Sequence, residues 1–196
     1  MNGLWLIGLL PVAAVLGGCG KQSAAAPGSS GGATEAVPTT VAAPTTAIAA
    51  ASTFIAIPGL PAKAQPKLQT IKVWLGAEEL ITEMARSPVE VQTGMMFRTN
   101  MAENEAMIFV LPYEQQAAFW MANCPYPLSV AYINTDGVIA EIHPLESFNT
   151  NLVVAAAMNI RFALETPQGW FNRHHVWTGA VVRTESGSLK HTFLRE

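Results

Sequence analysis

The chain has little charge, and its basic residues form no cluster. Lys and Arg number 11 and Asp and Glu 14 in 196 residues, so charged residues make up 13% and the net charge is -3. Binding to nucleic acid depends on a basic patch or stripe, and the scattered Lys and Arg residues provide none. We therefore exclude nucleic acid as a partner.

Paired carboxylates and common catalytic motifs are also missing. The only aspartate is Asp136, and the turn predicted at its position occupies it. The glutamates considered as acid or base fall on different predicted strands or loops: Glu105, Glu114, Glu141 and Glu165. A glycosidase-like site needs two carboxylates facing each other across a substrate, and the spacing sets up no such pair. The sequence contains neither a nucleophile elbow nor a phosphate-binding glycine loop.

Histidines are few and poorly spaced for a metal. The four are His143, His174, His175 and His191. Neighbours in sequence point their side chains apart, and no second pair has the spacing of ligands on a helix. We expect no metal and no cofactor.

Hydrophobic residues, in contrast, make up 50% of the chain, and one apolar run lies at its start. The run Leu4 to Gly18 is too short to span a bilayer comfortably and leads directly to Cys19. This arrangement resembles a bacterial lipoprotein signal with its lipobox. The resemblance implies cleavage before Cys19, a lipid on that residue and, because Gly20 follows instead of aspartate, the outer membrane. An uncleaved anchor is the alternative, and either one places the domain at the membrane surface of a bacterial envelope.

Residues 20–66 are predicted to be a disordered linker. From Ser23 to Ser52 nearly every residue is Ala, Gly, Pro, Ser or Thr, which offers little to offset the entropy cost of ordering. A tether of about 45 residues has a reach of roughly 35–40 Å. The apolar segment Phe54 to Ile57 interrupts this composition, and it is either a docking strand or an exposed apolar patch.

A β-rich domain is predicted over residues 67–196. Alternating residues indicate a hairpin of two strands, Thr70 to Leu75 and Glu79 to Met84. Ser87 and Glu90 form a capping box, with proline at the first helical position, for a short helix that ends at Gly94. Further strands are predicted at residues 106–110, 116–121, 128–133, 138–143, 160–165, 180–184 and 189–194, and a second short helix at residues 167–174.

Many short strands separated by turn residues indicate a mainly β fold, either a small barrel or a sandwich. Pro112 is expected to lie in a turn between two strands. Asp136 and Gly137 are expected to supply the positive φ angles of a two-residue hairpin turn. Arg161 and Glu165 are an even number of positions apart, so they should face the same side of the predicted strand, and a cross-strand ion pair is predicted there.

An ordered series of short motifs resembles the bacterial and archaeal family called domain of unknown function 192. The series is Glu90, Gly94-Met95-Met96-Phe97-Arg98, Met107-Ile108-Phe109, Phe119-Trp120-Met121, Pro127-Leu128, Tyr132-Ile133, Phe162-Ala163-Leu164-Glu165 and Gly169-Trp170. The resemblance covers about residues 70–185 and implies a small, often exported, β-rich domain with no established activity. Members usually carry glycine, threonine and aspartate where this chain has Ala106, Cys124 and Ser129.

The run from Phe119 to Ile133 is where a site is predicted. It combines aromatic, amide, thiol and proline residues at a corner between strands, and such a corner suits an apolar pocket with a few polar contacts. The predicted ligand-binding residues are Arg98, Trp120, Asn123, Cys124 and Ser129. Our main hypothesis is a non-enzymatic module, anchored by its lipid, that binds a small ligand or an envelope protein.

The alternative is an envelope hydrolase that acts on cell-wall glycan or an acyl ester. Cys124 would be its nucleophile, and His143 and Glu105 the other reacting groups. A nucleophilic thiol needs a base that lowers its pKa, so this hypothesis requires Cys124 and His143 to lie within hydrogen-bonding distance. The simpler expectation is that Cys124 fills buried space as a small hydrophobic residue.

Overall fold

The structure is a computed structural model that describes residues 54–194. The predicted signal segment, Cys19 and residues 20–53 of the linker lie outside the described residues. Within residues 54–194, no helix has the length and apolar character needed to cross a membrane.

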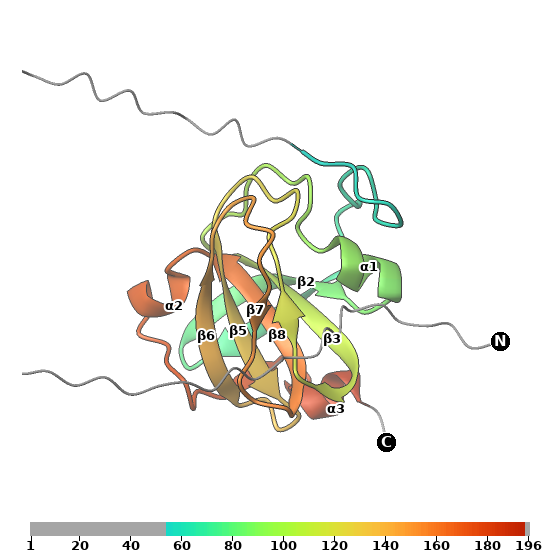
Figure 1. Cartoon of the computed structure of the whole chain (residues 1–196). Helices are drawn as coiled ribbons and strands as arrows, with labels where there is room; N and C mark the ends of the chain where they lie inside the picture. The colour runs from blue at the N-terminus through green and yellow to red at the C-terminus, as the bar shows by residue number, and fades with distance from the viewer. Residues whose placement is uncertain (1–53, 195–196) are drawn as a thin grey trace, which may run out of the picture. The chain divides into compact units, whose positions relative to one another are not determined.

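The domain is mainly β, as predicted, and is built on one mixed sheet (Figure 1). The eight strands of the sheet lie in the order β10-β9-β1-β2-β3-β8-β5-β6. Their bounds are β1 Thr70–Leu75, β2 Glu78–Ala85, β3 Glu105–Gln115, β5 Leu128–Asn134, β6 Ile139–Leu145, β8 Ile160–Pro167, β9 Val182–Thr184 and β10 Gly187–Ser188. A separate pair joins β4 Ala118–Phe119 to β7 Val153–Val154, and the helices are α1 Pro88–Thr93, α2 Trp170–Arg173 and α3 Leu189–Phe193.

The two ends of the sheet approach each other without closing. An isolated bridge joins Val138, before β6, to Val181, before β9. A backbone hydrogen bond from Ile139 N–H to the Ala180 carbonyl, 2.9 Å from N to O, supports this contact. The sheet of residues 54–194 is therefore strongly curved, but it is not a closed barrel.

The central strands are buried on both faces and separate two hydrophobic cores. Alternate residues of a strand point to opposite faces, so β3, β5 and β8 contribute to both cores. The first core contains Val73, Leu75, Leu80, Met84, Ala106, Ile108, Ala131, Ile133, Ile139, Phe162, Leu164, Trp170, Phe171, Val176, Val182 and Leu189. The second core contains Ala85, Met95, Met107, Phe109, Leu111, Ala117, Met121, Cys124, Leu128, Val130, Tyr132, Leu145, Ala155, Ile160 and Ala163. Burial on both faces explains the continuous apolar run in the sequence of β5.

Local signals identified the first elements correctly. Strands β1 and β2 pair antiparallel, as the alternation predicted. Helix α1 carries the predicted capping box, with the Ser87 hydroxyl accepting from Glu90 N–H and the Glu90 carboxylate accepting from Ser87 N–H. Gly94 ends the helix at a positive φ of 46°.

The predicted turn at Pro112 and the predicted last strand are both wrong. Strand β3 continues through the expected turn at Pro112, because a register shift between Val110 and Gln115 absorbs the irregularity in its pairing with β8. The last element is helix α3 instead of a strand. The Ser188 hydroxyl accepts from His191 N–H and caps this helix.

Two detailed predictions about side chains and turns also fail. Of Asp136 and Gly137, only Gly137 has a positive φ, of 82°, and its N–H bonds to the Asn134 carbonyl. Arg161 and Glu165 form no ion pair. In both pairings of β8 the register shifts between Ile160 and Phe162, so the alternation of faces is interrupted at Arg161 and does not carry to Glu165. Glu165 is instead 4% exposed within the sheet.

Candidate functional site

Three loops meet at one end of the second core. They follow α1, β4 and β6, and backbone hydrogen bonds join them: Phe97 N–H donates to the Asn123 carbonyl at 2.7 Å, and Phe148 N–H donates to the Cys124 carbonyl at 2.9 Å. Phe97, Asn123 and Phe148 have φ angles of 62°, 58° and 57°. Left-handed conformations are costly for aromatic residues, and such residues concentrate at binding sites and switches. This three-loop junction is therefore the first place to look for recognition.

The segment before the domain docks on this junction. We call residues 54–66 the N-terminal strap; Figure 1 shows it beside α1. The side-chain amide of Asn123, which is 2% exposed, bonds to both backbone groups of one strap residue, Ile55. Ile55 N–H donates to Asn123 Oδ1 at 2.8 Å, and Asn123 Nδ2 donates to the Ile55 carbonyl at 2.9 Å. The Phe54 ring stacks on Phe97 at 5.3 Å and meets Phe148 edge-on at 5.6 Å, measured between centroids.

We call Phe97, Asn123 and Phe148 the Asn123 clamp. Of the two alternatives for Phe54 to Ile57, docking is the one observed, although the segment forms no regular strand. Asn123 was predicted as a ligand residue, whereas Phe148 was not. The apolar segment Phe54 to Ile57 was the sequence signal for docking.

Arg98 fastens the other end of the strap. Its guanidinium forms a two-pronged ion pair with Glu83, with N to O distances of 2.7 and 2.8 Å, and donates to the Pro66 carbonyl at 3.2 Å. Glu83 also accepts from Leu68 N–H at 2.6 Å. Gln65 donates to the carbonyls of Glu90 and Gly94 at the end of α1. Arg98 therefore holds the start of the domain instead of lining an open cleft.

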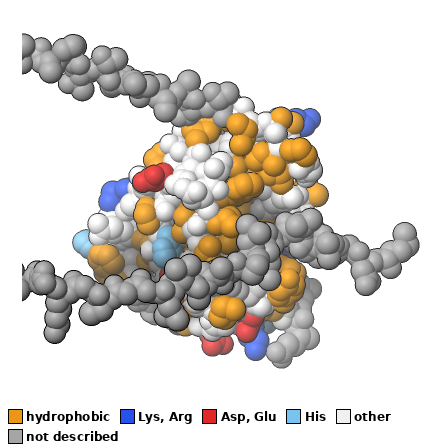
Figure 2. Space-filling model, in the orientation of Figure 1, with side chains coloured by type: hydrophobic (Ala, Val, Ile, Leu, Met, Phe, Trp, Pro, Cys, Tyr) orange, Lys and Arg blue, Asp and Glu red, His pale blue; other side chains and the backbone are white. Residues whose placement is uncertain are grey.

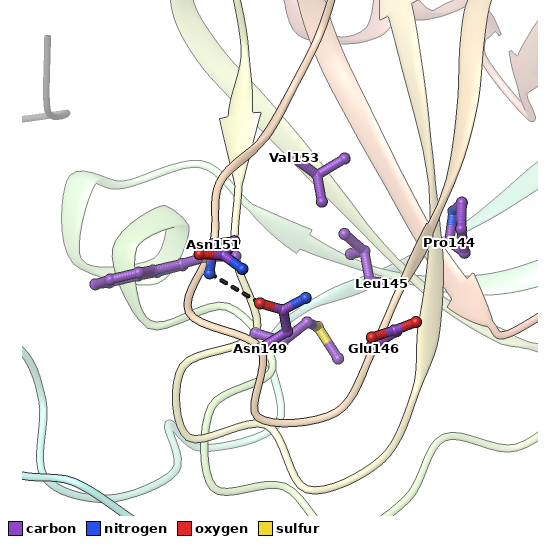
Figure 3. A pocket seen from close by; sticks show the side chains of 8 residues that line it. Pro144, Leu145, Glu146, Asn149, Asn151 and Val153 are labelled. Atoms are coloured by element: carbon purple, nitrogen blue, oxygen red, sulfur yellow. Dashed lines mark hydrogen bonds between the residues drawn. The ribbon is translucent and has the colours of Figure 1, made fainter. Parts of the chain in front are cut away.

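Trp120 does line an open pocket. The pocket has a volume of about 210 Å³ and is bounded by Trp120, Met121, Pro144, Leu145, Glu146, Asn149, Asn151 and Val153. Figure 3 shows Val153 and Leu145 on its apolar side, and Asn149 joined to Asn151. That bond runs from Asn151 N–H to Asn149 Oδ1 at 2.9 Å. Within residues 54–194, the Glu146 carboxylate and the Asn151 side-chain amide make no hydrogen bond, so both are available to a ligand.

Cys124 is buried and unreactive in its surroundings. It is 3% exposed, and its thiol donates only a long bond, 3.6 Å, to the Tyr126 carbonyl. Burial, together with the nearby Glu165 carboxyl, raises the pKa of Cys124 to about 12. The thiol therefore stays protonated at neutral pH and behaves as the small hydrophobic residue that was the simpler expectation.

Glu165 is a buried acid without a partner. The strand register places Glu83, Met107, Glu165, Val130 and His143 in one row on the second-core face. Glu165 Oε2 is buried with no hydrogen-bond partner in the described chain. Burial raises the pKa of Glu165 to about 8, so the carboxyl is largely protonated at neutral pH.

Ser129 lies apart from the other predicted ligand residues. Its neighbours Leu128 and Val130 belong to the second core, so Ser129 faces the opposite side of β5. Its hydroxyl accepts from Gly169 N–H at 2.9 Å, immediately before α2. Ser129 therefore orders the turn before that helix.

The three residues of the hydrolase hypothesis are not hydrogen-bonded to one another. His143 Nε2 contacts Glu141 at 2.8 Å, and Glu105 forms an ion pair with Lys67 at 3.0 Å. No hydrogen bond joins Cys124 to His143 in the described part of the chain, so the base that the hypothesis requires is absent. Among residues 54–194, no group of three or more His, Cys, Asp or Glu side chains is placed to hold a metal ion.

Comparison with known proteins agrees with this fold. The family model of DUF192, described as an uncharacterised group, matches residues 72–184. A solved structure of a candidate transcription regulator from Sinorhizobium meliloti 1021 is 24% identical, with a TM-score of 0.58; the match covers 62% of this chain and 98% of that one. A protein of unknown function from Novosphingobium aromaticivorans DSM 12444 is 28% identical, with a TM-score of 0.57, and the match covers 61% and 90%. Comparison with curated proteins found no match.

Proposed function

The chain belongs to the DUF192 family of uncharacterised proteins, and we propose that its domain is a non-enzymatic binding module held at the bacterial cell envelope by a lipid on Cys19. The outer membrane is the favoured location, because Gly20 follows the cysteine. The observation that carries the binding role is the open pocket beside Trp120. It lies at the corner after β4 where the sequence predicted a ligand.

The lining of the pocket defines the chemistry of its ligand. An indole and aliphatic side chains offer an apolar surface, and two asparagines and one glutamate offer hydrogen bonds. Among residues 54–194, no Lys or Arg lines the pocket, so these residues offer an anion no counter-charge. A volume of about 210 Å³ lies below the roughly 300–1,000 Å³ of pockets for drug-sized molecules. The proposed ligand is therefore an uncharged, hydroxyl-rich ring, such as one sugar unit of an envelope glycan.

The residues considered for catalysis support a binding role. Cys124 is a protonated, buried thiol, and Glu105 is held by Lys67 and by Ala102 N–H. His143 pairs with Glu141. Each of these three groups has a structural partner or is enclosed by the core, and within residues 54–194 no base is hydrogen-bonded to the Cys124 thiol.

The test is binding of envelope glycan fragments to the full-length chain, measured by calorimetry and by thermal shift. Trp120→Ala is expected to weaken binding at least tenfold, because it removes the aromatic wall of the pocket. The matched control is Trp177→Ala, since Trp177 is 56% exposed and does not line the pocket. Absence of saturable binding across glycans, small envelope metabolites and peptides would refute the proposal. If the chain releases a product from any of these compounds, the domain is an enzyme and the proposed binding role is wrong.

The anchor is tested separately by cell fractionation. Cys19→Ser removes the sulfur that would carry the lipid, so the chain should leave the membrane fraction and lose incorporation of labelled fatty acid. A variant chain that stays with the membrane would favour the uncleaved anchor.

A further inference from the structure

The Asn123 clamp has the features of a peptide-binding site, and its present occupant is the chain's own strap. A carboxamide that accepts from the N–H of one residue and donates to the C=O of the same residue reproduces the hydrogen bonding of a neighbouring strand. Such contacts recognise the backbone of any extended segment, since they do not involve its side chains. Recognition of a particular segment then depends on the pockets around it.

The aromatic rings provide that selectivity. Phe97 and Phe148 come from loops about fifty residues apart in sequence, and Phe54 contacts both. The clamp therefore selects an aromatic side chain immediately before the residue whose backbone is held. The following side chain, Ile55, is 46% exposed, so the clamp accepts a range of residues at that position.

The geometry of the clamp is held independently of its occupant. Bonds from Phe97 N–H and Phe148 N–H to the corner at Asn123 and Cys124 fix the three loops together. Asn123 keeps its left-handed backbone through these bonds and through the Cys124 N–H bond to the Met121 carbonyl at 3.1 Å. A site whose shape comes from its own loops is pre-organised for a replacement ligand.

The occupant, in contrast, is held by few contacts. Phe54 is 49% exposed although it is docked. Within residues 54–194, the only backbone–backbone hydrogen bond of residues 57–65 is local, from Leu60 N–H to the Ile57 carbonyl. Figure 2 shows hydrophobic side chains gathered at the upper right, where Figure 1 places the strap and α1. Segments with few buried contacts open more readily than the core that they cover.

We infer that the Asn123 clamp is a peptide-binding site that the strap occupies in cis, and that an extended segment of a partner protein with an aromatic residue followed by an aliphatic one takes its place. The strap then acts as a built-in competitor, since its link to the domain keeps it at high effective concentration. This inference stands on the clamp alone and does not depend on the pocket beside Trp120.

The experiment uses the full-length chain and a labelled peptide of residues 51–60, followed by fluorescence anisotropy. The double substitution Phe54→Ala and Ile55→Pro empties the clamp. It removes the Phe54 ring and the Ile55 N–H that donates to Asn123 Oδ1. The emptied chain is expected to bind the peptide at least tenfold more tightly than the wild-type chain does. Peptides with alanine for phenylalanine, or with an N-methylated first isoleucine, should lose that binding.

The clamp itself is tested by adding Asn123→Asp to the emptied chain. This change keeps the shape and the backbone preference of the residue, but it replaces the donor to the peptide carbonyl with an oxygen. The tenfold gain should disappear, whereas the exposed control Asn100→Asp should retain it.

Three results would overturn the inference. The first is peptide binding that does not change when the clamp is emptied or when Asn123 is replaced. The second is loss of cooperative unfolding in the emptied chain, which would make the strap an integral part of the fold. The third is a concentration-dependent wild-type dimer that the emptying substitutions abolish, which would assign the clamp to the strap of a second copy.

Discussion

The two cores share three strands but differ in what encloses them. The first core is closed by strands β1, β2 and β9 and by helices α2 and α3. The second core is covered largely by loops and borders a buried acid, a thiol and the three-loop junction. Because alternate side chains of the same strands serve both, one sheet supports an enclosed core on one face and, on the other, a core next to which both proposed binding sites lie.

The largest expected effect compares matching aromatic deletions in the two cores. Phe162 in the first core is 0% exposed and Phe109 in the second is 1% exposed. Phe162→Ala should lower the free energy of unfolding by about 5 kcal/mol, and Phe109→Ala by about 3 kcal/mol, because loops collapse into a cavity more easily than strands and helices do. Urea unfolding measures both values. Equal losses would show that the loops over the second core are as rigid as the strands.

The second prediction concerns the buried acid of the second core. The folded-state pKa of Glu165 is raised from 4.5 to about 8, so the folded chain holds a proton that the unfolded chain releases above its ordinary pKa. Stability should therefore fall as the pH rises from about 4.5 to 8. Glu165→Gln keeps a neutral group of the same shape, and it should be more stable than wild type by on the order of 4 kcal/mol at pH 9, with little difference at pH 4.

The matched control for Glu165 is Glu141→Gln. Burial raises the pKa of Glu141, but hydrogen bonds from Ala157 N–H and Ala156 N–H lower it overall. Its contribution to stability is therefore present above the ordinary pKa and is lost as the pH falls. Glu141→Gln should destabilise the chain at neutral pH, the opposite sign to Glu165→Gln. Urea unfolding from pH 4 to 9 tests both, and a wild-type profile that does not decline would show that Glu165 is solvated.

The third prediction compares two ion pairs near the start of the domain. Arg98 and Glu83 are 16% and 10% exposed, whereas Lys67 and Glu105 are 61% and 35% exposed. Arg98→Gln should lower the free energy of unfolding by about 2–3 kcal/mol. It leaves the Glu83 carboxylate, which water hardly reaches, with the Leu68 N–H as its one donor. Lys67→Gln should cost far less, because water and salt screen this exposed pair. Thermal and urea unfolding provide both values, and similar losses would mean that water reaches the Arg98 pair.

Local sequence signals predicted the local structure well. The capping box set the start of α1, and alternation set β1 and β2, because hydrogen bonds and burial within a few residues determine these elements. The error at Pro112 arose where pairing with a distant strand overrode a local turn signal. The helix at Leu189 was missed because residues 189–194 were read as a strand and the capping role of Ser188 was not considered.

The candidate site was predicted only in part, for a physical reason. Trp120 and Asn123 stand in the run that the sequence singled out; Trp120 lines the pocket, and Asn123 bonds to the strap. The clamp, however, joins Ile55 to Asn123 across 68 residues, and it needs left-handed backbone at two phenylalanines. No local pattern encodes either feature, because the tertiary contacts of the three loops impose them.

The smallest expected effect is at Cys124, and it decides between the two hypotheses for the second core. In a Cys19→Ser chain, Cys124 is the only cysteine. Its thiol is 3% exposed and its pKa is raised to about 12, so at pH 7.4 it should react with iodoacetamide only as fast as the domain opens. Increasing urea should raise the labelling rate in step with unfolding, whereas ligands of the domain should slow it. Labelling in the native state faster than that of a free cysteine would require a thiolate beside a base, and the second core would then be a site of catalysis.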